Sequence, residues 1–262
     1  TKIEGLGLEL PESKDGKLSF MNRYVSNFYY KFLDSIESRG NTLNTGKLIK
    51  DTFITFRSEI NEIKPFQDKK IYTPEYFKNI ISSFEGNHMS FHVPPIQILE
   101  ACMTDDKYKP IFNLQSKSLK CVDTICDLLI NLLRNLSLLD EFLQFPNLSA
   151  IIISSLIDEI ITKSKNKTKK AINSILQNEH DYIWTDNKDF IALLEPSSTL
   201  NKDNKNITEL LEGYFNSVKI IVSHSIPKVI MTNIIREVEN NTLSFLLQNI
   251  VTDANIHLLK QD

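Results

Sequence analysis

The sequence predicts an all-α protein, and three observations support this fold class. Seven glycines and nine prolines among 262 residues are few turn-forming residues for a sheet-rich chain. Apolar residues make up 41% of the chain and recur mainly at spacings of three and four. No stretch shows the sustained alternation of apolar and polar residues that is typical of half-buried strands. We expect helices of about 20–45 residues in an elongated antiparallel four-helix bundle.

The N-terminal part predicts two helices. Residues 17–40 carry an aromatic ring at every fourth position from Phe20 to Phe32, which forms one apolar helical stripe. Gly40 is a plausible C-terminal cap for this helix. A second helix is expected from about residue 47 to 63, because Pro65 cannot continue it.

Two shorter helices follow. Thr73 is a good N-cap and Pro74 suits the first helical position, so a third helix is expected from there to Gly86. The segment GNHMSFHVPP then predicts a loop, and a short helix is expected over residues 95–103.

The centre of the chain predicts helices over about residues 112–134 and 138–163. The segment SKNKTKK is expected to interrupt the second of these, with a further helix running to Phe190. The five lysines around this segment indicate either a solvated break or a contact with a membrane or an anionic partner; they are Lys163, Lys165, Lys167, Lys169 and Lys170.

The last predicted helix, from residue 207 to about 251, contains Pro227. A proline inside a helix removes a hydrogen bond and costs about 3 kcal/mol. Apolar residues recur every fourth position from Val218 to Val238, and further apolar residues lie on other faces. We therefore expect a bend or local unwinding near Ser225 and exposed apolar residues on this helix.

Several function classes lack support in the sequence. A net charge of −3 argues against extensive nucleic-acid binding. The segment GNTLNTGKL has neither the spacing nor the hydroxyl residue of a phosphate-binding loop. His88 and His92 lack a third metal ligand nearby, and the three cysteines are expected to be buried thiols. Apolar runs such as SAIIISSLI are too short to span a bilayer.

Three stretches together resemble the stalk of the dynamin superfamily. SLKCVDTICDLLINLLRN, followed by a turn at Phe145-Pro146-Asn147-Leu148, resembles the second and third stalk helices. NEHDYIWTDNKDFI resembles the acidic and aromatic end of that hairpin, although Trp184-Thr185 replaces the usual Asn-Thr. The segment from Ile207 onward resembles the GTPase effector domain through Leu-Leu, Tyr-Phe and Pro-Lys-x-Ile-Met matches.

The resemblance implies a domain organisation and a function. Residues 1–193 would be the middle-domain part of the stalk, 194–206 a shortened linker where relatives carry a lipid-binding or variable insert, and 207–262 the effector domain. The chain would be the self-assembly stalk of a membrane-remodelling GTPase. It would have no catalytic residue, cofactor or metal of its own, and the missing GTPase domain would bind GTP and Mg²⁺.

The resemblance also implies partners and interfaces. The chain would form a homodimer, a tetramer and a helical polymer for membrane fission, with membrane contact through the missing insert and no nucleic acid. The parent protein would be cytoplasmic and peripheral on membranes, at mitochondria or at endocytic or secretory vesicles. The assembly loop would comprise Gly86, Asn87, His88 and Met89, and the dimer interface would include Ile80, Ile226, Ile230, Met231 and Ile234.

Two rival interpretations remain open from the sequence. A helical tether or adaptor for vesicle or cytoskeletal partners would share the long helices but would not polymerise. An all-α hydrolase or transferase would need a deep pocket with convergent polar groups and shifted pKa values, for which the sequence gives no indication.

Overall fold

The computed structural model describes residues 10–37, 44–84, 95–194 and 204–259, and these residues form helices and turns without a strand. The all-α prediction is therefore confirmed for the described part, whereas the antiparallel four-helix arrangement stays a prediction. The chain divides into two compact units. The first unit comprises Thr1–Thr52, Asp123–Thr168 and Ile230–Asp262, and the second comprises Phe53–Val122 and Lys169–Val229.

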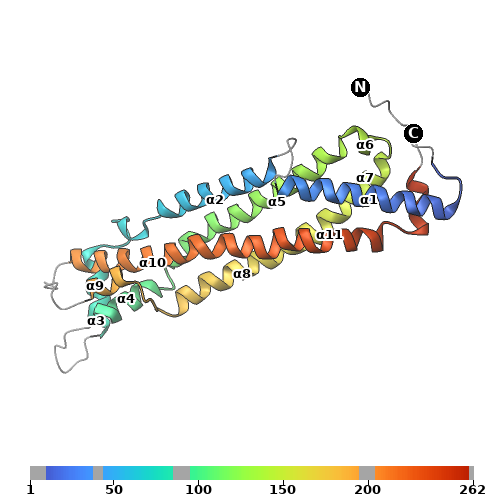
Figure 1. The fold of residues 1–262 in the computed structure, drawn as a ribbon. Helices are drawn as coiled ribbons and strands as arrows, with labels where there is room; N and C mark the ends of the chain where they lie inside the picture. Colours follow the sequence, from blue (N-terminus) through green and yellow to red (C-terminus); the bar gives the residue numbers. More distant parts are fainter. Residues whose placement is uncertain (1–9, 38–43, 85–94, 195–203, 260–262) are drawn as a thin grey trace. The chain divides into compact units, whose positions relative to one another are not determined.

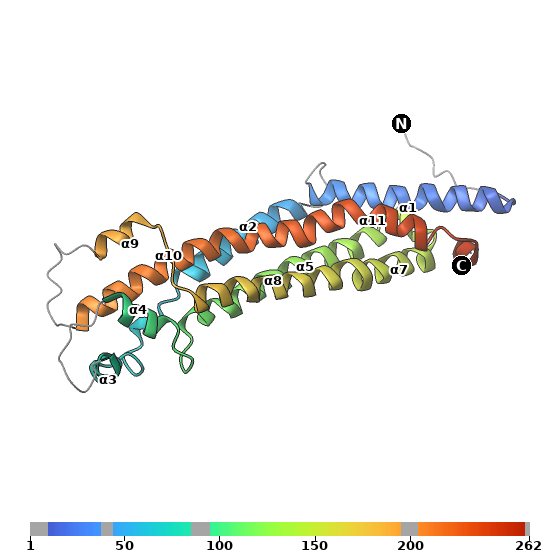
Figure 2. The same ribbon diagram turned by 90° about the horizontal axis from the view of Figure 1, so that it is seen from below.

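In the first unit, α1 (Lys14–Ile36) lies beside α11 (Arg236–Asn249), as Figures 1 and 2 show. The α1 helix begins where the Ser13 Oγ accepts a hydrogen bond from the Gly16 N–H at 3.2 Å. The Tyr29 hydroxyl of α1 donates to the Glu239 carbonyl oxygen of α11 at 2.7 Å. The expected C-cap, Gly40, lies outside the described residues.

The predicted aromatic stripe of α1 is confirmed, because every ring from Phe20 to Phe32 at this spacing is buried. The stripe packs on α6 (Asp140–Leu143) and on the start of α7 (Pro146–Ser155). The ring centroids of Phe28 and Phe142 are 5.0 Å apart, an edge-to-face contact that adds to burial. Tyr24 lies within this cluster, and its hydroxyl donates to the Phe142 carbonyl at 3.0 Å.

The predicted break in the lysine-rich segment is wrong. After α7 the chain continues through a π-helical turn (η3, Leu156–Ile161) into α8 (Thr162–Asp181) without leaving the helix. Lysine is a good helix former, so a lysine-rich composition does not end a helix. The small polar residues are also buried there, and the Thr168 hydroxyl donates to the Ser164 carbonyl at 2.7 Å. The predicted continuation to Phe190 is also wrong, since α9 (Lys188–Leu193) is separate.

The second unit includes the C-terminal half of α2 (Thr45–Asn61), together with α3 (Pro74–Phe84) and α4 (Pro95–Met103). The α3 and α4 helices contact each other. The expected N-cap of α3 is confirmed, because the Thr73 Oγ1 accepts from the Tyr76 N–H at 3.1 Å. The following turn Pro110–Leu114 leads into α5 (Gln115–Ser137).

A buried cation caps the end of α2 in this unit. Lys219 is 7% exposed, and its ammonium group donates to the carbonyl oxygens of Asn61 and Ile63 at 3.2 and 3.3 Å. The last carbonyls of a helix lack partners inside the helix and carry partial negative charge, so an ammonium group is well placed there. Burial nevertheless lowers the pKa of Lys219.

The C-terminal helix is continuous from α10 (Asn204–Ile230) through a π-helical turn (η4, Met231–Ile235) into α11. The expected unwinding near Ser225 is wrong, because α10 passes through Pro227 without a break. The departure from α-geometry comes one turn later, at η4. By length and composition, Ile207–Asn249 is also long and apolar enough to cross a membrane, but half of its most apolar window is buried within the chain.

Candidate functional site

The predicted assembly loop, Gly86 to Met89, lies outside the described residues, so its role stays a prediction. Ile80, the first predicted dimer residue, is half-buried on α3 in the second unit.

Three of the other predicted dimer residues are not exposed. Ile226, Ile230 and Ile234 each have 0% of their surface accessible to solvent. A spacing of four places them on one side of the helix, and that side is the core face. The expected exposure of apolar residues is therefore wrong at these three isoleucines, because their own chain already covers them, and their place in a dimer interface stays a prediction.

Met231 is the remaining predicted dimer residue, and it is 39% exposed at the start of η4. Its neighbour Thr232 is also exposed. Met231 is thus the one residue of the predicted set on this helix that a second copy could contact without any rearrangement of the fold.

Among the described residues, the aromatic side chains with the highest exposed fractions follow α8. Tyr182 and Trp184 are 72% and 65% exposed, in a non-helical segment that joins α8 to α9. Exposure alternates along residues 182–187, since Tyr182, Trp184 and Asp186 are exposed and the residues between them are half-buried. Period-two exposure indicates an extended segment that presents both aromatic rings on its outer side.

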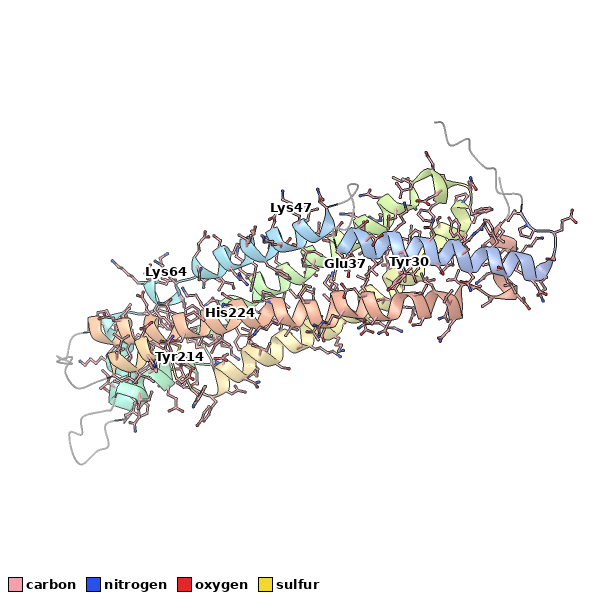
Figure 3. All side chains as sticks on the ribbon, viewed as in Figure 1. Tyr30, Glu37, Lys47, Lys64, Tyr214 and His224 are labelled. Atoms are coloured by element: carbon pink, nitrogen blue, oxygen red, sulfur yellow. The ribbon has the colours of Figure 1, made fainter. Side chains whose placement is uncertain are left out.

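The backbone of this segment is anchored to α10. The Trp184 N–H donates to the Tyr214 hydroxyl at 3.3 Å, and Tyr214 is fully buried. Figure 3 marks Tyr214, whose ring contacts Phe190 of α9 with centroids 5.5 Å apart. Burial raises the pKa of Tyr214 to about 12, so its hydroxyl stays protonated at neutral pH.

Two further contacts fix where the segment ends. The Asn187 side chain caps α9 by accepting hydrogen bonds from the N–H groups of Asp189 and Phe190, at 2.9 and 3.3 Å. Where α9 meets α10, a Cβ on Gly213 would lie 2.7 Å from Leu193 Cδ1, so Leu193 occupies the space of the missing side chain. The two exposed rings therefore project from a backbone that is held on both sides.

Sequence reasoning used residues 178–191 only as a pattern and missed the exposure of these rings. The sequence does contain a signal for a new helix at this point, because Asn187 is a typical N-cap residue and Asp189 places an acidic residue in the first turn. Tyr182 and Trp184 come just before this helix start, so they could have been assigned to a connecting segment. Glu179, which lies in the same stretch, is half-buried, and burial raises the pKa of its carboxyl.

The described residues hold no arrangement that suggests catalysis by metal or thiol. No three His, Cys, Asp or Glu side chains lie together as a metal site in this part of the chain. The three cysteines are buried, as predicted. Burial raises the pKa of Cys102 and of Cys121 to about 12, so these thiols are protonated and poor nucleophiles.

Comparison with known families accounts for the whole chain. The family model for the dynamin central region matches residues 1–199, and the model for the dynamin GTPase effector domain matches residues 199–262. A comparison with curated individual proteins gives no match. Because the first model alone covers well over half of the 262 residues, the chain belongs to the dynamin family, and it consists of the central region and the GTPase effector domain that form the stalk.

Proposed function

We propose that this chain is the self-assembly stalk of a dynamin-like, membrane-remodelling GTPase. In this role it dimerises and then polymerises helically, and the assembly drives membrane fission. GTP hydrolysis, with GTP and Mg²⁺ bound, belongs to a GTPase domain of the parent protein and not to this chain. The parent protein is cytoplasmic and acts peripherally on membranes.

The observation that carries the proposal is the adjacency of the two family matches. The central region and the effector domain follow one another without a gap and cover all 262 residues. The all-α fold of the described residues agrees with a structural module. A symmetric dimer joined by a second, non-closing contact gives a helical filament, which is the geometry that such a stalk needs.

Sedimentation velocity of the purified chain tests the proposal. We expect the sedimentation coefficient to rise with protein concentration and with falling salt, first to a dimer and then to larger species. A helical tether or adaptor would stop at a fixed small size. A chain that sediments as a monomer at all concentrations and salts would contradict the proposal.

Met231→Asp examines whether the exposed end of the C-terminal helix takes part in the dimer. The residue is 39% exposed, so the change should preserve helicity and weaken dimerisation. Asn240→Asp is the matched control, because it adds the same charge at an exposed position of α11. An unchanged dimer mass in Met231→Asp would remove Met231 from the interface.

A further inference from the structure

The segment that joins α8 to α9 has one edge of backbone groups without partners. All of its residues, 182–187, belong to the second unit. In an extended chain the backbone N–H and C=O groups of successive residues point to opposite edges. The Trp184 N–H points to α10, where it donates to the Tyr214 hydroxyl at 3.3 Å. The backbone groups of Ile183 and Thr185 therefore point to the opposite edge, and among the described residues they make no hydrogen bond.

An edge of this kind pairs readily with a second extended chain. Unpaired N–H and C=O groups along an extended segment are a template for the backbone of a peptide that lies beside it. Ile183 and Thr185 each offer one donor and one acceptor. Pairing orders this segment little further, because Tyr214 and the Asn187 cap of α9 already hold its backbone.

The two exposed rings of the segment are spaced to hold a flat group between them. Side chains two residues apart on an extended chain leave the backbone about 6.6 Å from each other. A flat group in van der Waals contact with a ring on each side needs roughly 7 Å. Tyr182 and Trp184 are 72% and 65% exposed, and within the described part of the chain neither ring contacts another ring or a cation. A guanidinium group is flat, carries a positive charge and stacks on aromatic faces, so an arginine side chain fits this space.

The charge around the rings also favours a cation. Residues 181–189 contain one exposed lysine and three exposed aspartates, which are Asp181, Asp186 and Asp189. Asp181 accepts a hydrogen bond from the Gln177 amide at 2.6 Å. None of the three carboxylates forms an ion pair with a described residue. The excess of negative charge therefore selects a positively charged partner.

A peptide fits these features better than a lipid bilayer does. Asp181 and Asp186 lie on either side of the rings, and carboxylates oppose contact with the anionic leaflet to which peripheral proteins bind. A bilayer surface also lacks the regular succession of donors and acceptors that the edge at Ile183 and Thr185 requires.

We propose that residues 181–189 form a docking site for an extended, arginine-containing peptide of a partner protein. The peptide backbone pairs with Ile183 and Thr185, and one arginine side chain enters between Tyr182 and Trp184. This inference goes beyond self-assembly, because the partner is a different protein and the site is complete in a single copy of the chain.

A fluorescein-labelled hexapeptide that alternates arginine and valine is the probe for the first test. Its anisotropy should rise to saturation with increasing concentration of the full chain. Unlabelled peptide should change the emission of Trp184, the only tryptophan in the chain, over the same range. A glutamate–valine peptide and an arginine–valine peptide with methylated backbone nitrogens should each bind at least about tenfold more weakly, because the first reverses the charge and the second removes backbone donors.

Substitutions in the segment provide the second test. Trp184→Ala and Tyr182→Ala should each weaken binding of the probe about tenfold, because each removes one aromatic face from the arginine. Asp186→Asn should weaken it about threefold at low salt and less at high salt. Tyr30→Ala and Asp34→Asn are the matched controls, since they remove an exposed ring and an exposed carboxylate in the first unit and should leave binding unchanged. Circular dichroism establishes that every variant keeps its helicity.

The outcomes separate this site from its alternatives and from the proposed function. The docking site is overturned if the probe does not bind, or if Trp184→Ala and the methylated peptide bind as tightly as the unmodified pair, since charge alone then accounts for binding. It is also overturned if Trp184 emission responds to phosphatidylserine vesicles or to the concentration of the chain itself and not to the probe, because a lipid surface or a second copy then covers the rings. A chain that stays monomeric but binds the probe in the expected pattern fails as a self-assembling stalk and keeps the docking site.

Discussion

Two adjacent residues on the C-terminal helix should respond very differently to the same substitution. Ile230 is fully buried and Met231 is 39% exposed, so Ile230→Asp and Met231→Asp add the same charge to a core and to a surface. Ile230→Asp should lower the free energy of unfolding severely. Met231→Asp should change it by less than about 1 kcal/mol, as is usual for surface substitutions.

The cost at Ile230 can be worked out from its burial. Losing a fully buried isoleucine side chain removes about 3 kcal/mol of hydrophobic stabilisation. The introduced carboxyl has an unfolded-state pKa of about 3.9, and keeping it protonated in the core at pH 7 costs about 4 kcal/mol. Together these terms give about 7 kcal/mol, which is within the range of the total stability of a typical domain.

The charge term also predicts a pH dependence. The core raises the folded-state pKa of the introduced carboxyl above its unfolded value. The protonated group is therefore tolerated at low pH, and stability is lost as the pH rises. Between pH 7 and pH 5 the deficit of Ile230→Asp should shrink by about 2.7 kcal/mol, because each pH unit is worth about 1.36 kcal/mol.

Thermal and urea unfolding followed by circular dichroism measure these differences, with Ile230→Val as a control that preserves the apolar core. A loss of more than 10 °C in the melting temperature is expected for Ile230→Asp, at about 2–4 °C per kcal/mol. Equal stability of Ile230→Asp and the wild type would refute the buried placement of the core face. A collapse of Met231→Asp would refute the exposed placement of η4.

Three further predictions concern buried polar groups. The cysteine thiols should resist alkylation at pH 8 in the native chain and react fully in denaturant, as followed by mass spectrometry, because burial keeps them protonated and inaccessible. Tyr24→Phe should lower unfolding free energy by about 1–2 kcal/mol, since the hydroxyl contacts the Phe142 carbonyl at 3.0 Å and the Ser149 Oγ at 2.7 Å; an unchanged urea midpoint would contradict this role. Burial lowers the pKa of Lys219 in the folded state, so the unfolded chain binds more protons than the folded chain between this lowered pKa and about 10.4. In that pH range the wild type should gain stability relative to Lys219→Met as the pH rises. Parallel profiles of stability against pH for the two proteins would contradict the lowered pKa.

Local features of the fold were predictable where one physical signal dominated. The aromatic residues of α1 recur at one spacing and are too apolar for any exposed face, so their burial followed from the sequence. The start of α3 was equally clear, because Thr73 and Pro74 supply a cap acceptor and a preset backbone angle at consecutive positions.

The errors arose where two signals competed. The lysine-rich segment looked like a loop because it is polar, yet lysine favours helix, and the small residues between the lysines lie buried within α8. At Pro227 a proline inside a helix does lower helix stability, but the buried apolar residues on both sides keep the helix continuous. The helix propensity of lysine was a local signal in the first case, whereas in the second case the packing around Pro227 is not contained in any local pattern.

The candidate dimer residues could be predicted only in part, because one apolar spacing has two possible meanings. The spacing of Ile226, Ile230 and Ile234 shows that something covers them, but the same spacing serves a chain's own core and a partner's surface equally well.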